Sequence, residues 1–243
     1  MQTEDEEWGL PAFPAPVPPW RPLQAGRVLH GLTVLLVEDS RLASEAMRLL
    51  CHRSGARIRR ADCHASALRH LRAYRPGAVI VDIGLPDGDG LSLIAQLSAT
   101  APRVPVLLGL SGDPDQREAA LAAGADGFLA KPVDSLAAFQ QAILGALPVA
   151  ARPRRPRLLP GETVVPDKAA LQDDLAYLAT LLRPGMDTQT RRYAAQFLES
   201  LGRAAEEPLL MQVAWDLAAP DGEAAIPRLQ SWLEQRLDER LMI

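Results

Sequence analysis

Short apolar runs alternate with segments of helical period between residues 32 and 147. The runs predict five strands, at 33–38, 57–61, 78–83, 104–110 and 127–130, and the other segments predict helices at 41–54, 64–75, 90–99, 115–124 and 135–147. In the runs VLLV, AVIV and VLLGL the apolar residues are consecutive rather than alternate, which indicates strands that are covered on both faces. The pattern therefore predicts an α/β domain built on a five-stranded, doubly wound parallel sheet.

After residue 166 the strand pattern stops and only helical periodicity remains. Breaks at Pro184-Gly185, near Pro208 and at Pro220-Asp221-Gly222 divide this region into four amphipathic segments. Their apolar residues are Leu171, Leu175, Leu178 and Leu182; Tyr193, Phe197 and Leu201; Leu209 or Leu210, Val213 and Leu217; and Ile226, Leu229, Leu233 and Leu237. Because a helix with one apolar face must bury that face, these segments predict a small all-α helical bundle.

Proline marks the segments outside the two folded regions. We divide the chain into a Pro-rich N-terminal extension at 1–28, the α/β domain at 29–148, a Pro/Arg-rich linker at 149–165 and the helical domain at 166–243. Two interpretations of the extension stay open: a solvated tail, or a segment whose Trp8, Phe13 and Trp20 dock on a groove of this protein or of a partner. The linker arginines favour a solvated hinge over a contact with nucleic acid or an acidic partner. They are Arg152, Arg154, Arg155 and Arg157.

Composition and charge exclude several classes of protein. With 243 residues, 48% of them hydrophobic, and a net charge of −4, the chain lacks the basic bias of a nucleic-acid-binding protein. Cys51 and Cys63 are its two cysteines and form neither a disulfide framework nor a metal-ligand set, which favours a reducing compartment. The N-terminus has no apolar signal core, and no stretch has the length of a membrane helix. We therefore expect a cytoplasmic protein with no membrane contact.

Polar residues close the predicted strands. The first ends in Glu38-Asp39, the third in Asp82, the fourth in Ser111 and the fifth in Lys131-Pro132. Because ligands of a doubly wound sheet gather at the carboxyl ends of its strands, we expect these side chains to converge. Three adjacent carboxylates repel one another unless a cation neutralises them, and hard oxygen ligands suit Mg²⁺, which also accepts phosphate oxygens. The sequence therefore predicts a metal and phosphate site.

Each of these pieces also has a simpler explanation. Glu38-Asp39-Ser40 is equally consistent with a helix cap, in which Ser40 is the N-cap residue. The stretch Asp87-Gly88-Asp89-Gly90 is better explained as a turn than as a ligand loop. Taken singly, Lys131 is typical of a solvated lysine and Ser111 of an ordinary hydroxyl at a strand end. The argument for a site depends on their combination at successive strand ends.

The combination resembles the receiver domain of bacterial two-component response regulators, over roughly residues 31 to 148. The resemblance implies a flavodoxin-like sheet and a role in phosphorelay signal transduction. The motifs that carry it are Glu38-Asp39; DIGLPDGDG, which opens with Asp82; PVLLGLSG, which contains Ser111; and GADGFLAKPVD, which contains Phe128 and Lys131-Pro132.

The resemblance implies that Asp82 is the phosphoacceptor. It further implies that Glu38, Asp39, Asp82 and the backbone carbonyl of Gly84 hold Mg²⁺. Gly84 itself offers no side chain beside the phosphoryl group. A protein of this kind is a phosphoacceptor that catalyses only its own phosphorylation and dephosphorylation, so we expect no other enzyme activity.

The same resemblance assigns the residues around the transferred group. Ser111 is expected to bond one phosphoryl oxygen and Lys131 to neutralise another, while Phe128 is the aromatic residue whose rotamer follows phosphorylation. A serine at position 111 departs from the threonine that is commoner in the family. Gly109 and Gly112 loosen the fourth strand, which leaves the size of the switch open.

The helical domain carries an acidic excess, with eight basic and thirteen acidic side chains from residue 166 on. DNA binding is therefore not expected, because no helix presents a basic, base-reading face. An enzymatic output is not expected either, since the region has no His and no Cys. The stretch RRYAAQFLESLGRAA is faintly similar to the core helix of histidine phosphotransfer domains. Gln196 stands at the histidine position and Glu199 at the lysine position, so relay through this domain should be lost; an unrelated docking or dimerisation bundle is an equal alternative.

We therefore expect a response regulator that accepts a phosphoryl group on Asp82 and switches a helical protein-interaction output. The expected partners are a sensor histidine kinase or phosphotransfer protein, and a downstream regulator that binds residues 166–243. Homodimer formation stays open. Two alternatives remain: a DNA-binding transcriptional regulator with an unorthodox helical output, and a phosphate sink for a shared kinase.

Overall fold

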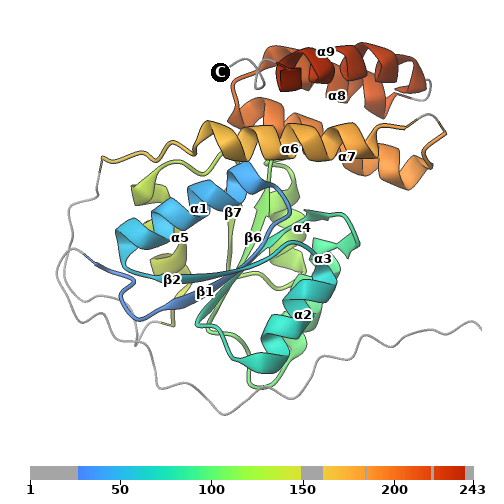
Figure 1. Cartoon of the computed structure of the whole chain (residues 1–243). Coiled ribbons are helices and arrows are strands. Elements are labelled where there is room, and N and C mark those ends of the chain that lie inside the picture. The colour runs from blue at the N-terminus through green and yellow to red at the C-terminus, as the bar shows by residue number, and fades with distance from the viewer. Residues whose placement is uncertain (1–26, 149–160, 184, 220–221, 239–243) are drawn as a thin grey trace, which may run out of the picture.

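A parallel sheet of five strands in the order β2-β1-β3-β6-β7 forms the centre of the N-terminal domain (Figure 1). The computed structural model describes residues 27–148, 161–183, 185–219 and 222–238. The strands are β1 (Thr33–Val37), β2 (Arg57–Ala61), β3 (Ala78–Asp82), β6 (Val106–Ser111) and β7 (Gly127–Ala130). Neighbouring strands pair in parallel, with Val81 opposite both Val37 of β1 and Gly109 of β6. The order reverses between β1 and β3, where such a sheet opens a crevice for ligands.

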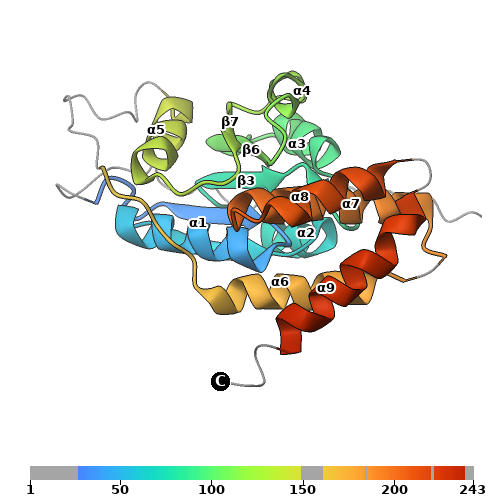
Figure 2. The ribbon, with the colours of Figure 1, turned by 90° about the horizontal axis from the view of Figure 1, so that it is seen from above.

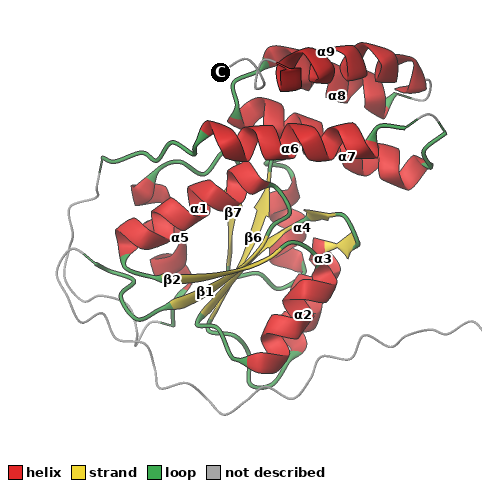
Figure 3. Ribbon diagram, in the orientation of Figure 1, coloured by secondary structure: helices red, strands yellow, loops and turns green. Residues whose placement is uncertain are grey.

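Helices cover both faces of the sheet, as the consecutive apolar runs predict (Figures 1 and 3). All residues of β3 and β6 are buried. One face is covered by α1 (Arg41–Ser54) and α5 (Leu136–Ala146), and the other by α2 (His64–Ala73), α3 (Gly90–Ala99) and α4 (Gln116–Ala122). Between β3 and α3 lies a two-stranded antiparallel hairpin, β4 (Gly84–Leu85) with β5 (Gly88–Asp89). The prediction of an α/β doubly wound fold is confirmed, whereas the hairpin was not predicted.

The C-terminal region forms the predicted helical bundle. Its elements are α6 (Lys168–Leu181), α7 (Thr188–Ala204), α8 (Pro208–Ala218), the 3₁₀ turn η2 (Gly222–Ala225) and α9 (Ile226–Asp238). Their apolar faces form one core, which includes Leu178, Phe197 and Leu229 and also receives Leu42 from α1. The bundle lies at the carboxyl-end edge of the sheet, with α6 and α7 nearest to it (Figure 1). Seen from above, α7 and α8 lie over the strands and α6 runs beside α1 (Figure 2).

The end of the predicted linker contacts the N-terminal domain. Leu136 donates its backbone N–H to the carbonyl of Glu162 at 3.0 Å, and Val164 donates to Asp134 at 2.9 Å. Val164 is buried in the same core as α1 and α5. The Pro-rich extension, with its proposed docking residues, and the four linker arginines lie outside the described residues. Within the described residues, no helix is long and apolar enough to cross a membrane.

Candidate functional site

Three carboxylates meet where the sheet order reverses. Glu38 and Asp39 follow β1, and Asp82 is the last residue of β3. Each offers one oxygen, and these oxygens all lie within 4.8 Å of one another. Glu38 and Asp82 are buried, and Asp39 is partly buried. The structure thus brings together the three acids that the sequence analysis placed at one edge of the sheet.

Lys131, which follows β7, is the cation of this cluster. Its Nζ lies 2.7 Å from Glu38 Oε2 and 3.0 Å from Asp82 Oδ2, and only 7% of its side chain is exposed. Its backbone N–H donates to the carbonyl of Ser111 at 2.8 Å, which fixes the end of β7 against the end of β6. Lys131 is therefore not the solvated lysine that it would resemble if taken alone.

The charges of the cluster change one another's pKa values. Burial raises the pKa of Glu38 well above its usual range, and the charge of Asp82 adds to this effect. Burial, and then Asp82, raises the pKa of Asp39 to about 6. Burial alone would lower the pKa of Lys131, but the nearby carboxylates outweigh it, and the pKa of Lys131 is raised. Since three acids face one lysine, the pocket favours a further positive charge.

The backbone around Asp82 is held closely. Ile83 donates its N–H to the carbonyl of Leu110 at 3.0 Å, and the N–H of Gly84 lies 3.4 Å from Asp82 Oδ1. Gly90, at the start of α3, passes so close that a Cβ there would lie 2.0 Å from the Asp82 carbonyl oxygen. Only glycine permits this approach, so Gly90 sets the path of the loop after β3. The metal-ligand role of the Gly84 carbonyl stays a prediction.

Ser111 and Phe128 lie at adjacent strand ends. Ser111 is the last residue of β6, next to Leu110, which pairs with Asp82. Its Oγ accepts a hydrogen bond from the N–H of Asp113 at 3.1 Å. Phe128 on β7 is buried, and a Cβ at Gly109 would lie 3.3 Å from its ring. The aromatic ring is therefore turned inward here, and the roles of both residues in a switch stay predictions.

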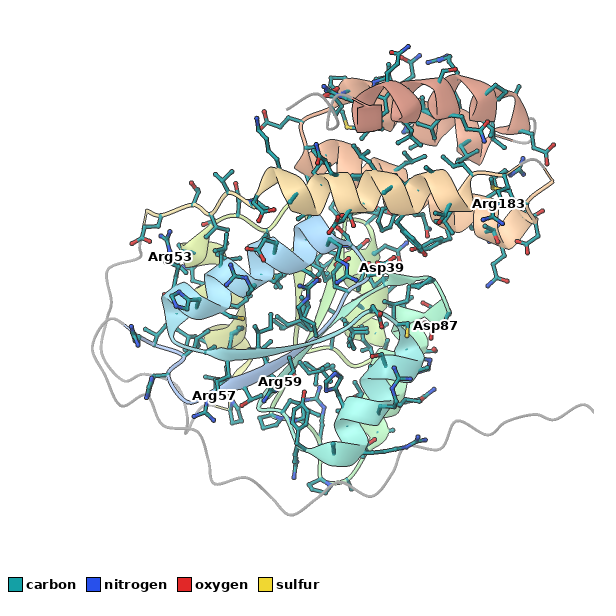
Figure 4. The ribbon with its side chains drawn as sticks, in the orientation of Figure 1. Asp39, Arg53, Arg57, Arg59, Asp87 and Arg183 are labelled. Carbon is teal, nitrogen blue, oxygen red and sulfur yellow. The ribbon has the colours of Figure 1, made fainter. Side chains whose placement is uncertain are left out.

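The two aspartates of the DGDG stretch serve as helix caps. Asp87 accepts hydrogen bonds from the N–H groups of His64 and Ala65, at 2.7 and 3.0 Å, and so caps α2 from a distance in the sequence. Asp89 is the N-cap of α3 and accepts from the N–H of Leu91 at 2.9 Å. In Figure 4, Asp87 lies in the loop above α2, apart from Asp39. The interpretation of this stretch as a turn agrees with these contacts.

Asp174 of α6 reaches the start of α1 from the bundle. One carboxylate accepts from Ser40 Oγ at 2.8 Å, from the N–H of Arg41 at 2.7 Å and from the N–H of Leu42 at 3.0 Å. Ser40 is the N-cap of α1, which was one of the two interpretations of Glu38-Asp39-Ser40, and its Oγ accepts from the N–H of Ala43. The first N–H groups of α1 are thus all satisfied, two of them by another domain. Burial raises the pKa of Asp174, against the opposite effect of these hydrogen bonds.

Tyr193 of α7 donates its hydroxyl hydrogen bond to the carboxylate of Asp39. Burial, together with the charge of Asp39, raises the pKa of Tyr193, so the hydroxyl keeps its proton and remains a donor. Figure 4 places Asp39 beneath α6 and α7, where the two domains meet. Sequence reasoning missed both bundle residues. The available signal was Asp174, a carboxylate that falls among the leucines of a buried helix face, between Leu171 and Leu178.

The comparisons with known proteins agree with this geometry. The family model of the response regulator receiver domain matches residues 34–143. The chain carries a response regulator receiver domain. The resemblance predicted from the motifs is therefore confirmed for this part of the chain, and the bundle lies outside the match.

Several relatives share the receiver domain. The KDP operon transcriptional regulatory protein KdpE of Escherichia coli (strain K12) is 33% identical over 99 residues, which are 41% of this chain and 44% of KdpE. The virulence transcriptional regulatory protein PhoP of Salmonella typhimurium (strain LT2) is 34% identical over 117 residues, 46% of this chain and 52% of PhoP. The chain thus spans about half the length of the curated relatives it matches.

A solved receiver domain is similar as well. It belongs to the sensor histidine kinase PA1611 of Pseudomonas aeruginosa PAO1 and has a magnesium ion coordinated in its active site cleft. It is 29% identical to this chain, with a TM-score of 0.42, and the similarity covers 46% of this chain and 94% of that domain.

Proposed function

We propose that this protein is a response regulator that accepts a phosphoryl group on Asp82 from a sensor histidine kinase or a phosphotransfer protein. The observation that carries the proposal is the buried contact of Lys131 with both Asp82 and Glu38, at 3.0 and 2.7 Å, beside the carboxylate of Asp39. A lysine buried among three acids at the switch point of a parallel sheet suits the transfer of an anionic group.

Mg²⁺ fits the carboxylates of this pocket. Around an octahedral Mg²⁺ ion with bonds of roughly 2.1 Å, two ligand oxygens lie about 3 to 4 Å apart. The oxygens of Glu38, Asp39 and Asp82 lie within 4.8 Å of one another and are all hard carboxylate ligands. When bound, the ion supplies charge that offsets the oxygens of the transferring group. Glu38, Asp39 and Asp82 would hold it, together with the carbonyl of Gly84.

The chain's own residues perform the rest of the transfer. An Asp82 carboxylate oxygen attacks phosphorus, so that a new O–P bond forms while the bond from phosphorus to the donor breaks and the leaving group departs with its electron pair. Lys131 is already placed to pair with the phosphoryl oxygens as the negative charge on Asp82 moves into the new group. Ser111 would donate its hydroxyl to another of these oxygens. Such chemistry depends mainly on positioning and charge, and requires no further enzyme activity.

The bundle is the output in this proposal. Its helices carry an acidic excess. Asp174 bonds to the start of α1, and Tyr193 bonds to Asp39 in the acceptor pocket. A change of charge at Asp82 therefore has a direct route to the packing of α6 and α7, which supports a protein-interaction output for a downstream regulator. DNA binding and a phosphate sink have no observation of this kind in their favour. A cytoplasmic location stays a prediction from the cysteine pattern.

Phosphorylation by a small donor tests the proposal. Full-length protein is incubated with phosphoramidate and Mg²⁺, and the added phosphoryl group is measured by intact mass. The wild type should gain one group, and Asp82→Asn should gain none. Label on Asp82→Asn at the wild-type level would overturn the assignment.

Asp89→Asn is the matched control, because it makes the same chemical change a few residues away. Asn caps a helix about as well as Asp, so α3 should keep its N-cap. This variant should be labelled like the wild type. Loss of label in both variants would mean that the loop after β3 tolerates no such change, and label would then be located by peptide mapping of the wild type.

A further inference from the structure

One face of α7 lies over the ends of three neighbouring strands. Tyr193 bonds to Asp39, which follows β1. Gln196 Oε1 lies 3.6 Å from the position that a Cβ would take at Gly84, which follows β3. Ser200 lies as close to Gly112, which follows β6, with its Cβ 3.4 Å from the corresponding position. The three α7 residues follow one another along the helix in the order in which β1, β3 and β6 follow one another in the sheet.

The spacing of these contacts matches the spacing of the strands. Residues 193, 196 and 200 are three and four apart, so they share one face of a helix. From 193 to 200 a helix rises by about 10 Å, and two strand spacings also measure about 10 Å. Helix α7 therefore crosses the strand ends, and Gln196, the middle one of these three residues, lies over the loop that follows Asp82.

Glycine on the receiver side allows this close approach. Gly84 and Gly112 present no side chains to α7, and any Cβ at either position would be in van der Waals contact with Gln196 or Ser200. Asp174 adds a second attachment by capping α1. Residue Asp82 itself is only 5% exposed beneath this arrangement.

We propose that α7 occupies, within the chain, the receiver surface on which a helical phosphodonor protein must dock to reach Asp82, so that the bundle and the donor compete for one site. This inference rests on the proposed function. The faint similarity of α7 to the core helix of histidine phosphotransfer domains puts Gln196 at the histidine position, and in the structure Gln196 lies beside Gly84, two residues after Asp82. The Gln196 amide carries no transferable group. The bundle is thus an internal occupant of the donor site that must move away before phosphorylation.

An engineered disulfide tests whether α7 rests there and whether it blocks the acceptor. The Cβ positions at 112 and 200 are 3.4 Å apart, close to the roughly 3.5 to 4.5 Å of a disulfide. Gly112→Cys and Ser200→Cys are combined with Cys63→Ser in the full chain. The matched control pairs Ser200→Cys with Gly145→Cys, because a Cβ at Gly145 meets no atom within 4 Å. The fraction of protein that has formed the disulfide under mild oxidation is measured over time from the intact mass.

We expect the 112/200 pair to close quickly without denaturant and the 145/200 pair to stay reduced. We further expect phosphoramidate and Mg²⁺ to label the oxidised 112/200 protein at least tenfold more slowly than the same protein after reduction. Conversely, Tyr193→Phe combined with Asp174→Ala should release the bundle, slow the closing of the 112/200 disulfide and speed labelling severalfold.

The outcomes separate the inference from the proposed function. If the 112/200 pair closes no faster than the 145/200 pair, α7 does not rest on the strand ends and the inference is wrong. Equal labelling of the oxidised and reduced forms also overturns it, while the proposed function stands. Absence of label on the wild type and on the reduced variant overturns the proposed function, and the inference that depends on it falls as well.

Discussion

The Tyr193 hydroxyl donates a hydrogen bond to the carboxylate of Asp39, 154 residues earlier in the chain. Asp39 belongs to the acidic cluster that fits a divalent cation, and Tyr193 belongs to the bundle. One carboxylate is thus shared between the proposed metal site and the contact between domains. Cation binding and bundle docking are therefore expected to affect each other, because each uses the oxygens of Asp39.

Removing the Tyr193 hydroxyl should strengthen Mg²⁺ binding. In the wild type, an ion must displace or share a hydrogen bond to a charged group, an interaction worth roughly 1.5 kcal/mol, which corresponds to about a tenfold change in affinity. We expect Tyr193→Phe to bind Mg²⁺ about tenfold more tightly in a calorimetric titration of the full chain. Tyr177→Phe is the control, because the Tyr177 hydroxyl lies 3.3 Å from that of Tyr193 but does not bond to Asp39 in the described contacts. Unchanged or weaker binding by Tyr193→Phe would contradict the competition.

The sequence predicted the receiver domain well because its signals are local. Consecutive apolar runs place β1, β3 and β6, and the polar residue that ends each strand converges with the others once the strands are parallel. The acids Glu38, Asp39 and Asp82 therefore meet as predicted. The four bundle helices follow from apolar spacing and from the proline and glycine breaks in the same way.

The contacts between the domains could not be predicted from such signals. The hydrogen bonds of Asp174 to α1 and of Tyr193 to Asp39 depend on how two separately folded units pack, and no period in the sequence encodes that packing. Tyr193 is an ordinary residue for a helix, and Asp174 among the leucines indicates a buried partner but not which one. The Pro/Arg-rich composition of the predicted linker at 149–165 gives no signal for one arrangement of the domains. Similarly, Asp87 caps α2 at His64, which lies 23 positions earlier in the sequence, and no local pattern predicts that contact.

Removing the Asp174 carboxylate should loosen the start of α1. In Asp174→Ala the N–H groups of Arg41 and Leu42 lose their acceptor, and a capping loss of this kind costs about 1–2 kcal/mol. We expect hydrogen exchange of these two amides, measured by NMR, to speed up by about five- to thirtyfold. Asp173→Ala, an exposed neighbour on the same helix, should leave both amides unchanged. Equal protection of Arg41 and Leu42 in the two variants would show that Asp174 does not cap α1 in solution.

Two glycine substitutions should act in opposite directions. A Cβ at Gly90 would lie 2.0 Å from the Asp82 carbonyl oxygen, so Gly90→Ala forces the loop after β3 to move and should lower the free energy of unfolding by about 1–3 kcal/mol. A Cβ added at Gly145 in α5 would meet no atom within 4 Å, so Gly145→Ala should raise the free energy of unfolding by about 0.5–1 kcal/mol through helix propensity. Urea denaturation measures both. A neutral or stabilising Gly90→Ala would contradict the close approach of α3 to Asp82.

The two cysteines should differ sharply in reactivity. Burial raises the pKa of Cys51 to about 12, and Cys51 is only 1% exposed, whereas Cys63 is partly exposed. Because the thiolate is the reactive form, iodoacetamide at pH 8 should modify Cys63 and spare Cys51 until urea unfolds the chain. Modification of Cys51 in the folded protein at the rate of Cys63 would contradict the packing of α1 against the sheet.

The raised pKa of Cys51 also gives the sign of the pH effect on stability. Above an unfolded-state pKa of about 8.5 the unfolded chain releases the Cys51 proton while the folded chain keeps it, so unfolding becomes more favourable as the pH rises from 8.5 toward 10. Cys51→Ala should lack this part of the pH dependence in urea titrations at pH 7.5 and pH 9.5.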